Sequence, residues 1–191
     1  DDNTAVGYQA LTTNSTGATN TAVGRNSLAN NTTASNNTAV GNQSLGSNTT
    51  GTQNIAVGSL AADANTTGNY NVAIGHEALS TGTGDSHNTA IGNNAMKDAD
   101  GANHNTAVGS ASMNNITTGD YNTGVGSQTF DALTTGSNNV GVGYAALDTN
   151  TSGSKNIAVG QSAGDAITTG DGNVCVGHNA GDDLTTGNHN T

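Results

Sequence analysis

Proline and tryptophan are absent from this 191-residue chain, cysteine occurs once, and lysine and arginine together number three. Only 31% of the residues are hydrophobic and 3% are aromatic, which excludes the thick apolar core of an ordinary globular domain. The single cysteine, Cys175, excludes an intramolecular disulfide. No apolar run approaches the ~20 residues that a helix needs to cross a bilayer, so we expect no membrane insertion of this segment.

Charge and motifs exclude further functions. The 14 acidic residues give a formal net charge of −11 and leave no basic patch for nucleic acid or an anionic membrane. Glu77 is the only glutamate, and neither a His-x-x-x-His zinc pair nor a phosphate loop occurs. We therefore expect no enzyme and no required cofactor. No signal peptide is recognisable, so we expect any export signal or anchor to lie outside this segment.

What the chain does contain is a strict repeat. A glycine that ends the motif Ala-Val-Gly, here called the motif glycine, recurs at every seventeenth residue: Gly7, Gly24, Gly41, Gly58, Gly75, Gly92, Gly109, Gly126, Gly143, Gly160 and Gly177. An asparagine stands four residues before each of them. Because disorder needs no register and loops tolerate insertions, this spacing predicts stacked coils in continuous backbone contact.

The repeat predicts an all-β, parallel β-solenoid of about eleven coils of 17 residues each, running as one continuous array over residues 1–191. Seventeen residues are too few for a helix-turn-helix repeat, and Thr, Val, Asn and Gly are poor helix formers. At a strand spacing of ~4.8 Å the coils would rise roughly 50 Å. The chain starts and stops within the repeat without atypical capping coils, so we expect an excerpt of a longer fibre.

Columns of equivalent residues predict how each coil closes. The β-branched residue before each motif glycine, such as Val108, is assigned to the buried core. Small and then large apolar residues, three and four places after the glycine, are expected to fill a narrow interior. Where the large residue becomes Gly164 or Gly181, Ile167 or Leu184 is expected to replace the lost volume. Thr-Thr-Gly segments predict a turn, and the asparagines predict a ladder of hydrogen bonds between coils.

The motif Asn-Thr-Ala-Val-Gly, followed by a small residue and Leu, closely resembles the head repeats of trimeric autotransporter adhesins and the related repeats of bacteriophage tail fibres and other surface fibres. Asn3–Gly7, Asn71–Gly75 and Asn105–Gly109 carry it, and the resemblance spans the whole chain. It implies a left-handed parallel β-roll, commonly three chains side by side, outside a cell or on a virion. The family's repeats are usually shorter, and its neck and stalk do not occur in this sequence.

Two variable columns are candidate sites. Tyr70, His87, His104 and Tyr121 directly precede the Asn column in four consecutive coils, which predicts a ridge of stacked rings. This ridge could contact a glycan or a partner fibre, or it could be an exposed turn whose rings only stack on one another.

The second column lies five residues after the motif glycine and contains Asp131, Asp148, Asp165 and Asp182. In-register carboxylates would stand ~5 Å apart and repel one another. Such a column could bind Ca²⁺ through its oxygens, or it could be a solvated edge.

The leading functional hypothesis is a structural segment of an extracellular fibre or adhesin that extends and displays a binding surface. Its expected partners are further copies of the chain, as a homotrimer or filament, and a host-surface protein or glycan. A self-assembling surface filament and an ice- or glycan-binding solenoid are the alternatives. Ice binding usually requires a flat Thr-x-Thr face, and the adjacent threonines of Thr-Thr-Gly point in opposite directions.

Overall fold

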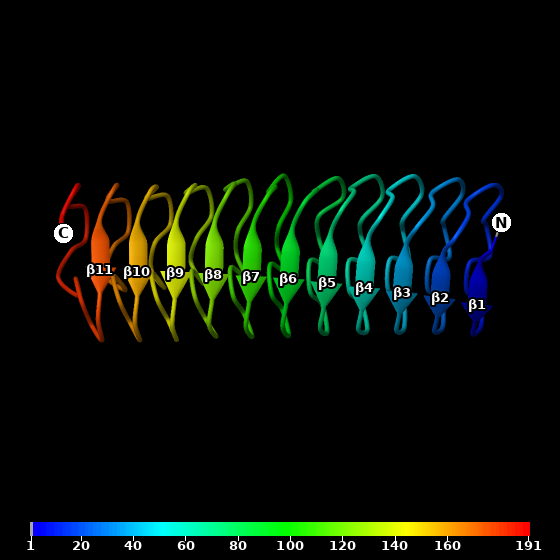
Figure 1. Ribbon diagram of the computed structural model, residues 1–191, viewed down its shortest axis with the longest axis horizontal. Helices are drawn as coiled ribbons and strands as arrows, with labels where there is room; N and C mark the ends of the chain where they lie inside the picture. The colour runs from blue at the N-terminus through cyan, green and yellow to red at the C-terminus, as the bar shows by residue number, and fades with distance from the viewer. Residues whose placement is uncertain (1) are drawn as a thin grey trace.

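The computed structural model describes residues 2–191 and contains eleven parallel strands of three residues each (Figure 1). These strands are β1 (Thr4–Val6), β2 (Thr21–Val23), β3 (Thr38–Val40), β4 (Ile55–Val57), β5 (Val72–Ile74), β6 (Thr89–Ile91), β7 (Thr106–Val108), β8 (Thr123–Val125), β9 (Val140–Val142), β10 (Ile157–Val159) and β11 (Val174–Val176). They form one sheet in sequence order, and each residue pairs with the residue 17 positions further on. The predicted parallel β-solenoid is confirmed.

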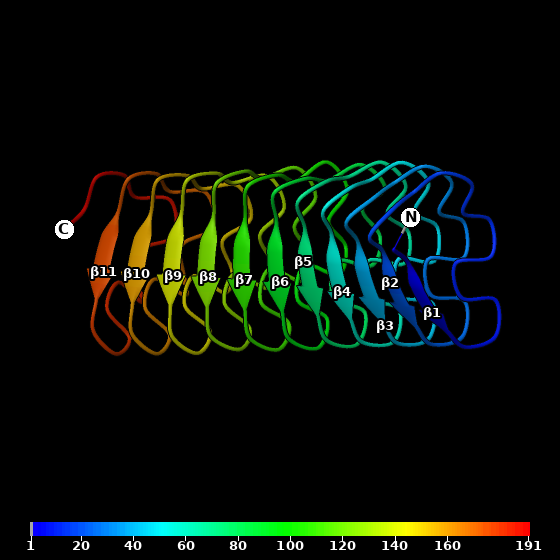
Figure 2. The ribbon, with the colours of Figure 1, turned by 45° about the vertical axis from the view of Figure 1, so that its right-hand side comes forward.

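The coils are stacked side by side into an elongated body, with the two termini at opposite ends (Figure 2). Each strand continues into turns and irregular segments that run around the coil and return to the next strand. Residues 2–191 include no helix of the length and apolarity needed to span a membrane.

The assignment of the β-branched column to the core is wrong. In β2–β11 the buried residue is the central one, as for Ala73 and Ala107, which are fully buried. Its neighbours point outward, so that Ile74 is 37% exposed and Val108 is only partly buried. Successive side chains of a strand face opposite sides, and a phase error of one residue exchanges the two faces. The small central residue fits because large side chains from elsewhere in the coil fill the interior.

The predicted filling of the interior is confirmed. Large residues four places after the motif glycine, including Leu28, Met96 and Phe130, are fully buried. Phe130 fits because β8 and β9 have glycine at their centres: a Cβ atom on Gly141 would lie 2.7 Å from the Phe130 Cε2 atom. Ile167 is also buried and lies beside Gly164, as expected for a side chain that replaces lost volume.

The asparagine column forms the predicted ladder, here called the strand Asn ladder. The Asn71 N–H donates to Asn54 Oδ1 at 2.9 Å, and Asn71 Oδ1 accepts from the Asn88 N–H at 3.0 Å. The Asn71 amide also donates to the backbone oxygen of Asp85 at 2.6 Å, across the coil. Similar bonds recur along the array, so these buried amides are satisfied and fix the register of the coils.

The motif glycines are required by close backbone packing. Gly75 has φ of 137°, in a region that other residues rarely adopt. A Cβ atom at Gly75 would collide with the backbone oxygen of Gly92 in the next coil. Only glycine therefore allows consecutive coils to approach this closely at the end of each strand.

Candidate functional site

A surface feature that runs along the whole array is the outward side of the sheet, here called the outer sheet face. It consists of the first and third residues of every strand, and every one of them is Thr, Val or Ile. Ile55 and Ile157 are each 41% exposed, and Val159 is 38% exposed. No charged side chain occupies either column, although the chain as a whole has a net charge of −11. The third residue of each strand belongs to the β-branched column, which from sequence alone suits a buried core equally well.

The predicted aromatic ridge of Tyr70, His87, His104 and Tyr121 is formed. Successive ring centroids are 4.8, 4.7 and 4.9 Å apart, and the ring planes differ by 14°, 8° and 7°. All four residues have φ near 60°, a left-handed conformation that costs about 1 kcal/mol or more for a residue with a side chain. Because the rings stack face to face, their inner faces cover one another and the ridge presents mainly ring edges.

In the acidic column, Asp148 lies close enough to Asp131 and Asp165 for their charges to act on it. Burial raises the pKa of the Asp148 carboxyl, and the charges of Asp131 and Asp165 raise it further. Burial also raises the pKa of Asp131. These couplings show that neighbouring carboxylates interact across the coils. Within residues 2–191, no three His, Cys, Asp or Glu side chains form a group that could hold a metal ion.

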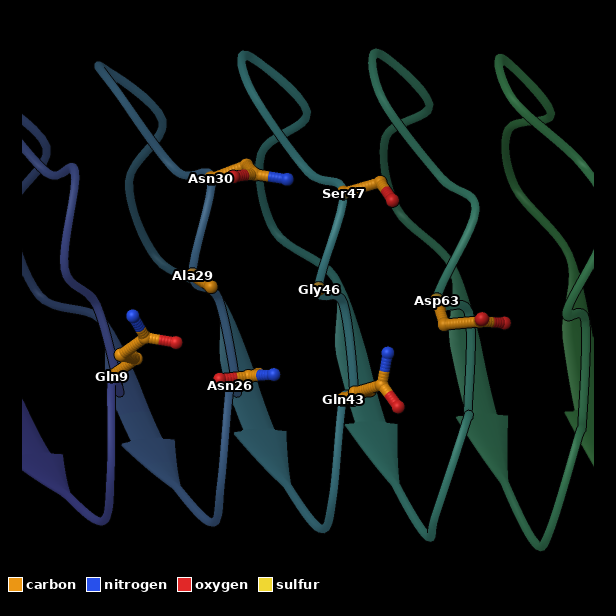
Figure 3. Close-up of a pocket in the computed structure, with 8 residues that line it drawn as sticks. All are labelled: Gln9, Asn26, Ala29, Asn30, Gln43, Gly46, Ser47 and Asp63. Atoms are coloured by element: carbon orange, nitrogen blue, oxygen red, sulfur yellow. The ribbon is translucent and has the colours of Figure 1, made fainter.

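A polar groove that the sequence did not predict crosses the first coils. Its volume is about 270 Å³, and its lining residues are Gln9, Asn26, Ala29, Asn30, Gln43, Gly46, Ser47 and Asp63. Figure 3 shows the amides of Gln9, Asn26 and Gln43 in a row along successive coils. The small residues Ala29 and Gly46 leave the hollow, and Asn26 Oδ1 has no hydrogen-bond partner. The groove can accept hydrogen bonds, but no aromatic ring lines it.

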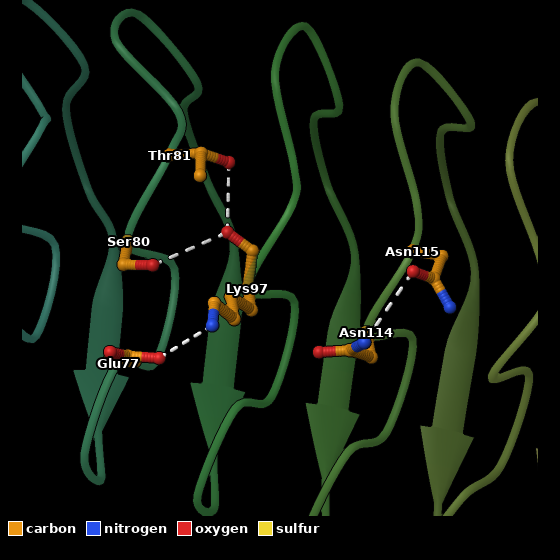
Figure 4. Close-up of polar contacts among 6 residues, drawn as sticks. All are labelled: Glu77, Ser80, Thr81, Lys97, Asn114 and Asn115. Carbon is orange, nitrogen blue, oxygen red and sulfur yellow. Dashed lines mark hydrogen bonds and ion pairs between the residues drawn. The ribbon is translucent and has the colours of Figure 1, made fainter.

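One ion pair joins coils within the described residues, between Lys97 and Glu77 at 2.7 Å (Figure 4). The hydrogen bond from Lys97 lowers the pKa of Glu77, and Glu77 raises the pKa of Lys97. Both side chains lie at the surface, so this pair contributes little to stability. The same coils are also joined by hydrogen bonds from Ser80 and Thr81 to the backbone oxygen of Lys97.

Cys175 is the central residue of β11 and is buried. Its Sγ atom occupies the space that a Cβ atom on Gly181 would need. Burial raises the pKa of this thiol above its usual value. Cys175 therefore fills the interior where most other strands have alanine.

No protein-family model matches the chain, and no curated protein matches it. The resemblance to adhesin head repeats therefore depends on the motif residues alone.

Proposed function

We propose that this chain is a structural segment of an extracellular fibre, in which copies of the chain associate through the outer sheet face. The fibre holds a binding surface away from a cell or virion, and it performs no reaction itself. The partner at the displayed surface would be a host-surface protein or glycan. The resemblance to the adhesin repeats favours a homotrimer, and a filament is the alternative assembly.

The outer sheet face is the observation that carries this proposal. Monomeric soluble proteins seldom expose a continuous uncharged strip of valine and isoleucine along their whole length. Here the strip extends from β1 to β11, while all 17 charged side chains lie in other columns. Association buries this strip and leaves the acidic side chains in water, where like charges keep separate fibres apart.

Paired aspartate substitutions on the two faces of the same strands test the proposal. Ile74→Asp with Val108→Asp places two charges on the outer sheet face, so we expect a folded chain that no longer assembles. Ala73→Asp with Ala107→Asp buries the charges in the interior, so we expect loss of folding, since a buried carboxylate without a partner costs several kcal/mol. Circular dichroism reports folding, and light scattering after size-exclusion chromatography reports assembly.

The parent protein should be a homo-oligomer under the same conditions. A monomeric parent at all accessible concentrations would exclude association as the role of the outer sheet face. Persistent assembly of the Ile74→Asp, Val108→Asp variant would show that copies meet through another surface.

Ice binding is a second candidate, favoured by the threonines of the same face. The first outward position is threonine in six strands: Thr4, Thr21, Thr38, Thr89, Thr106 and Thr123. Each threonine is followed two residues later by Val or Ile. The first and third strand positions therefore form two regular rows of methyl and hydroxyl groups. Ice binding requires this face to be free of other copies. An ice-growth assay on the monomeric fraction therefore separates it from the fibre proposal.

A further inference from the structure

The coil of β5 (residues 71–87) departs from the pattern of the four coils before it. Those coils have asparagine seven residues after the motif glycine and glycine or alanine ten residues after it. In the β5 coil these two positions are Gly82 and Asp85. A Cβ atom on Gly82 would lie 2.5 Å from Asp85 Oδ2 and 2.9 Å from its Cγ. The Asp85 carboxyl therefore enters the space beside Gly82 that an asparagine side chain would need.

This exchange interrupts two ladders that stabilise the N-terminal coils. The inner Asn ladder, made by Asn14, Asn31, Asn48 and Asn65, ends because Gly82 has no amide to donate. The backbone ladder of the same corner is interrupted as well. The Thr66 N–H donates to Thr83 O at 2.8 Å, but within the described chain the Thr83 N–H makes no equivalent bond to Asp100.

Asp85 bridges this interruption with only one of its two oxygens. Its Oδ1 accepts a hydrogen bond of 2.6 Å from the Gly101 N–H in the next coil. Its Oδ2 is buried without any hydrogen-bond partner, and the whole side chain is 2% exposed. An ionised carboxylate in this position leaves a charged oxygen unsatisfied, which is among the most costly arrangements in a protein interior.

The charges around Asp85 add to this cost. Burial is the main reason that its pKa is raised to about 6, and the carboxylates of Asp100 and Asp120 raise it further. The hydrogen bond from the Gly101 N–H and the nearby N–H of Ala102 oppose the rise but do not cancel it. The ion pair between Glu77 and Lys97 joins the same two coils at the surface.

We propose that residues 82–85 and 99–101, here called the Asp85 corner, form a proton-sensitive weak point at which the array opens locally. Protonation of Asp85 removes the buried charge, and its Oδ2–H can then donate to a neighbouring carbonyl, so the corner closes. Ionisation of Asp85 restores the unsatisfied charge, so the corner opens before the rest of the array. The array is therefore continuous in mildly acidic solution and locally loosened at neutral and alkaline pH.

The direction of the pH effect on the Asp85 corner follows from the linkage between proton binding and stability. In the open corner Asp85 returns to its ordinary pKa of 3.8, below its value in the closed corner. The closed corner therefore binds a proton more readily, and its stability is lost as pH rises through about 6. Between pH 5 and pH 8 the local opening equilibrium is expected to increase about tenfold.

Hydrogen exchange of the assembled protein, measured by mass spectrometry and corrected for intrinsic rates, tests this proposal. We expect peptides covering residues 80–102 to lose protection about tenfold between pH 5 and pH 8. Peptides from β2–β3 and β9–β10 should show no such change. Asp85→Asn cannot ionise and should abolish the dependence, whereas the control Asp148→Asn should retain it. His87→Asn should retain the pH dependence too, which would show that it arises at Asp85 and not at the nearby aromatic ridge.

A second variant keeps the test decisive if Asp85→Asn folds poorly. Gly82→Asn combined with Asp85→Gly restores the pattern of the preceding coils and should give pH-independent protection with a higher melting temperature. Equal protection of residues 80–102 at both pH values in the parent would overturn the proposal. So would a pH dependence that survives in both Asp85 variants, or protection that responds to calcium at constant pH.

Discussion

The N-terminal and C-terminal coils fill the same interior column with different chemistry. Seven residues after the motif glycine, the first four coils have the inner Asn ladder, in which each amide donates to the one before it. In the C-terminal coils the same column contains Ile116, Leu133 and Ile167, all buried. One backbone therefore accepts either a hydrogen-bonded filling or an apolar filling of the same column.

An isolated asparagine in the apolar region is satisfied within its own coil. Asn150 stands among apolar residues, and its Oδ1 accepts from the Gly153 N–H of its own corner at 2.8 Å. It has no amide partner in an adjacent coil, so it satisfies itself locally. Gly82 and Ala99 lie between the amide region and the apolar region, and the Asp85 corner falls at this boundary. The weakest junction is thus where one filling gives way to the other.

The largest expected effect comes from breaking the register between the two regions. Deleting residues 76–92 removes one whole repeat, including Gly82 and Asp85, and joins the regions with every ladder in phase. We expect this variant to remain folded, whereas deleting Thr81 alone should unfold several coils, because it shifts all following side chains to the wrong positions. Thermal unfolding by circular dichroism compares the two. Equal damage by both deletions would contradict continuous stacking.

Truncation of one buried side chain in each region should have a smaller effect. Phe130→Ala leaves a large cavity in the apolar region and should cost about 3–5 kcal/mol. Asn48→Ala removes three hydrogen bonds of 2.9 Å, because Asn48 donates to Asn31 Oδ1 and Gly51 O and accepts from the Asn65 amide. This should cost about 1–3 kcal/mol. Urea denaturation measures both. A larger loss for Asn48→Ala would mean that the amide ladder, not apolar filling, dominates the stability.

The repeat predicted most of the fold, because every residue was constrained by equivalent residues in ten other coils. The period, the parallel stacking and the Asn ladder could all be predicted from columns of equivalent residues. The same columns predicted that Ile167 fills the volume left empty at Gly164. The phase of the strand could not, since Val suits a buried or an outward position equally, and alanine is too small to mark a core. That error concealed the outer sheet face.

The candidate sites were predictable only as columns of residues. Stacking of Tyr70, His87, His104 and Tyr121 follows from spacing alone, and the structure confirms it. The Asp85 corner was missed because a lone aspartate in a glycine column is recognisable as a defect only when its lost hydrogen bonds are seen. The polar groove likewise depends on the small size of Ala29 and Gly46, which sequence variation alone does not highlight.

The smallest expected effect concerns the acidic column at the C-terminal end, which has no counterpart in the amide region. Burial and the charges of Asp131 and Asp165 raise the pKa of Asp148, so ionisation destabilises the folded state. Stability should therefore increase as pH falls towards 3.8, and Asp148→Asn should raise the melting temperature slightly at pH 7. Asp63→Asn, in the same column of the amide region but with the uncharged Gly46 and Ser80 as its neighbours in that column, is the matched control. Added salt should reduce the benefit of Asp148→Asn, because exposed charges are screened over ~10 Å at 0.1 M.

Calcium distinguishes the two interpretations of the acidic column, a solvated edge and a Ca²⁺ site. The stability of a solvated edge responds equally to calcium and to magnesium at one ionic strength. A rise specific to calcium, lost in the Asp148→Asn, Asp165→Asn variant, would instead identify a binding site.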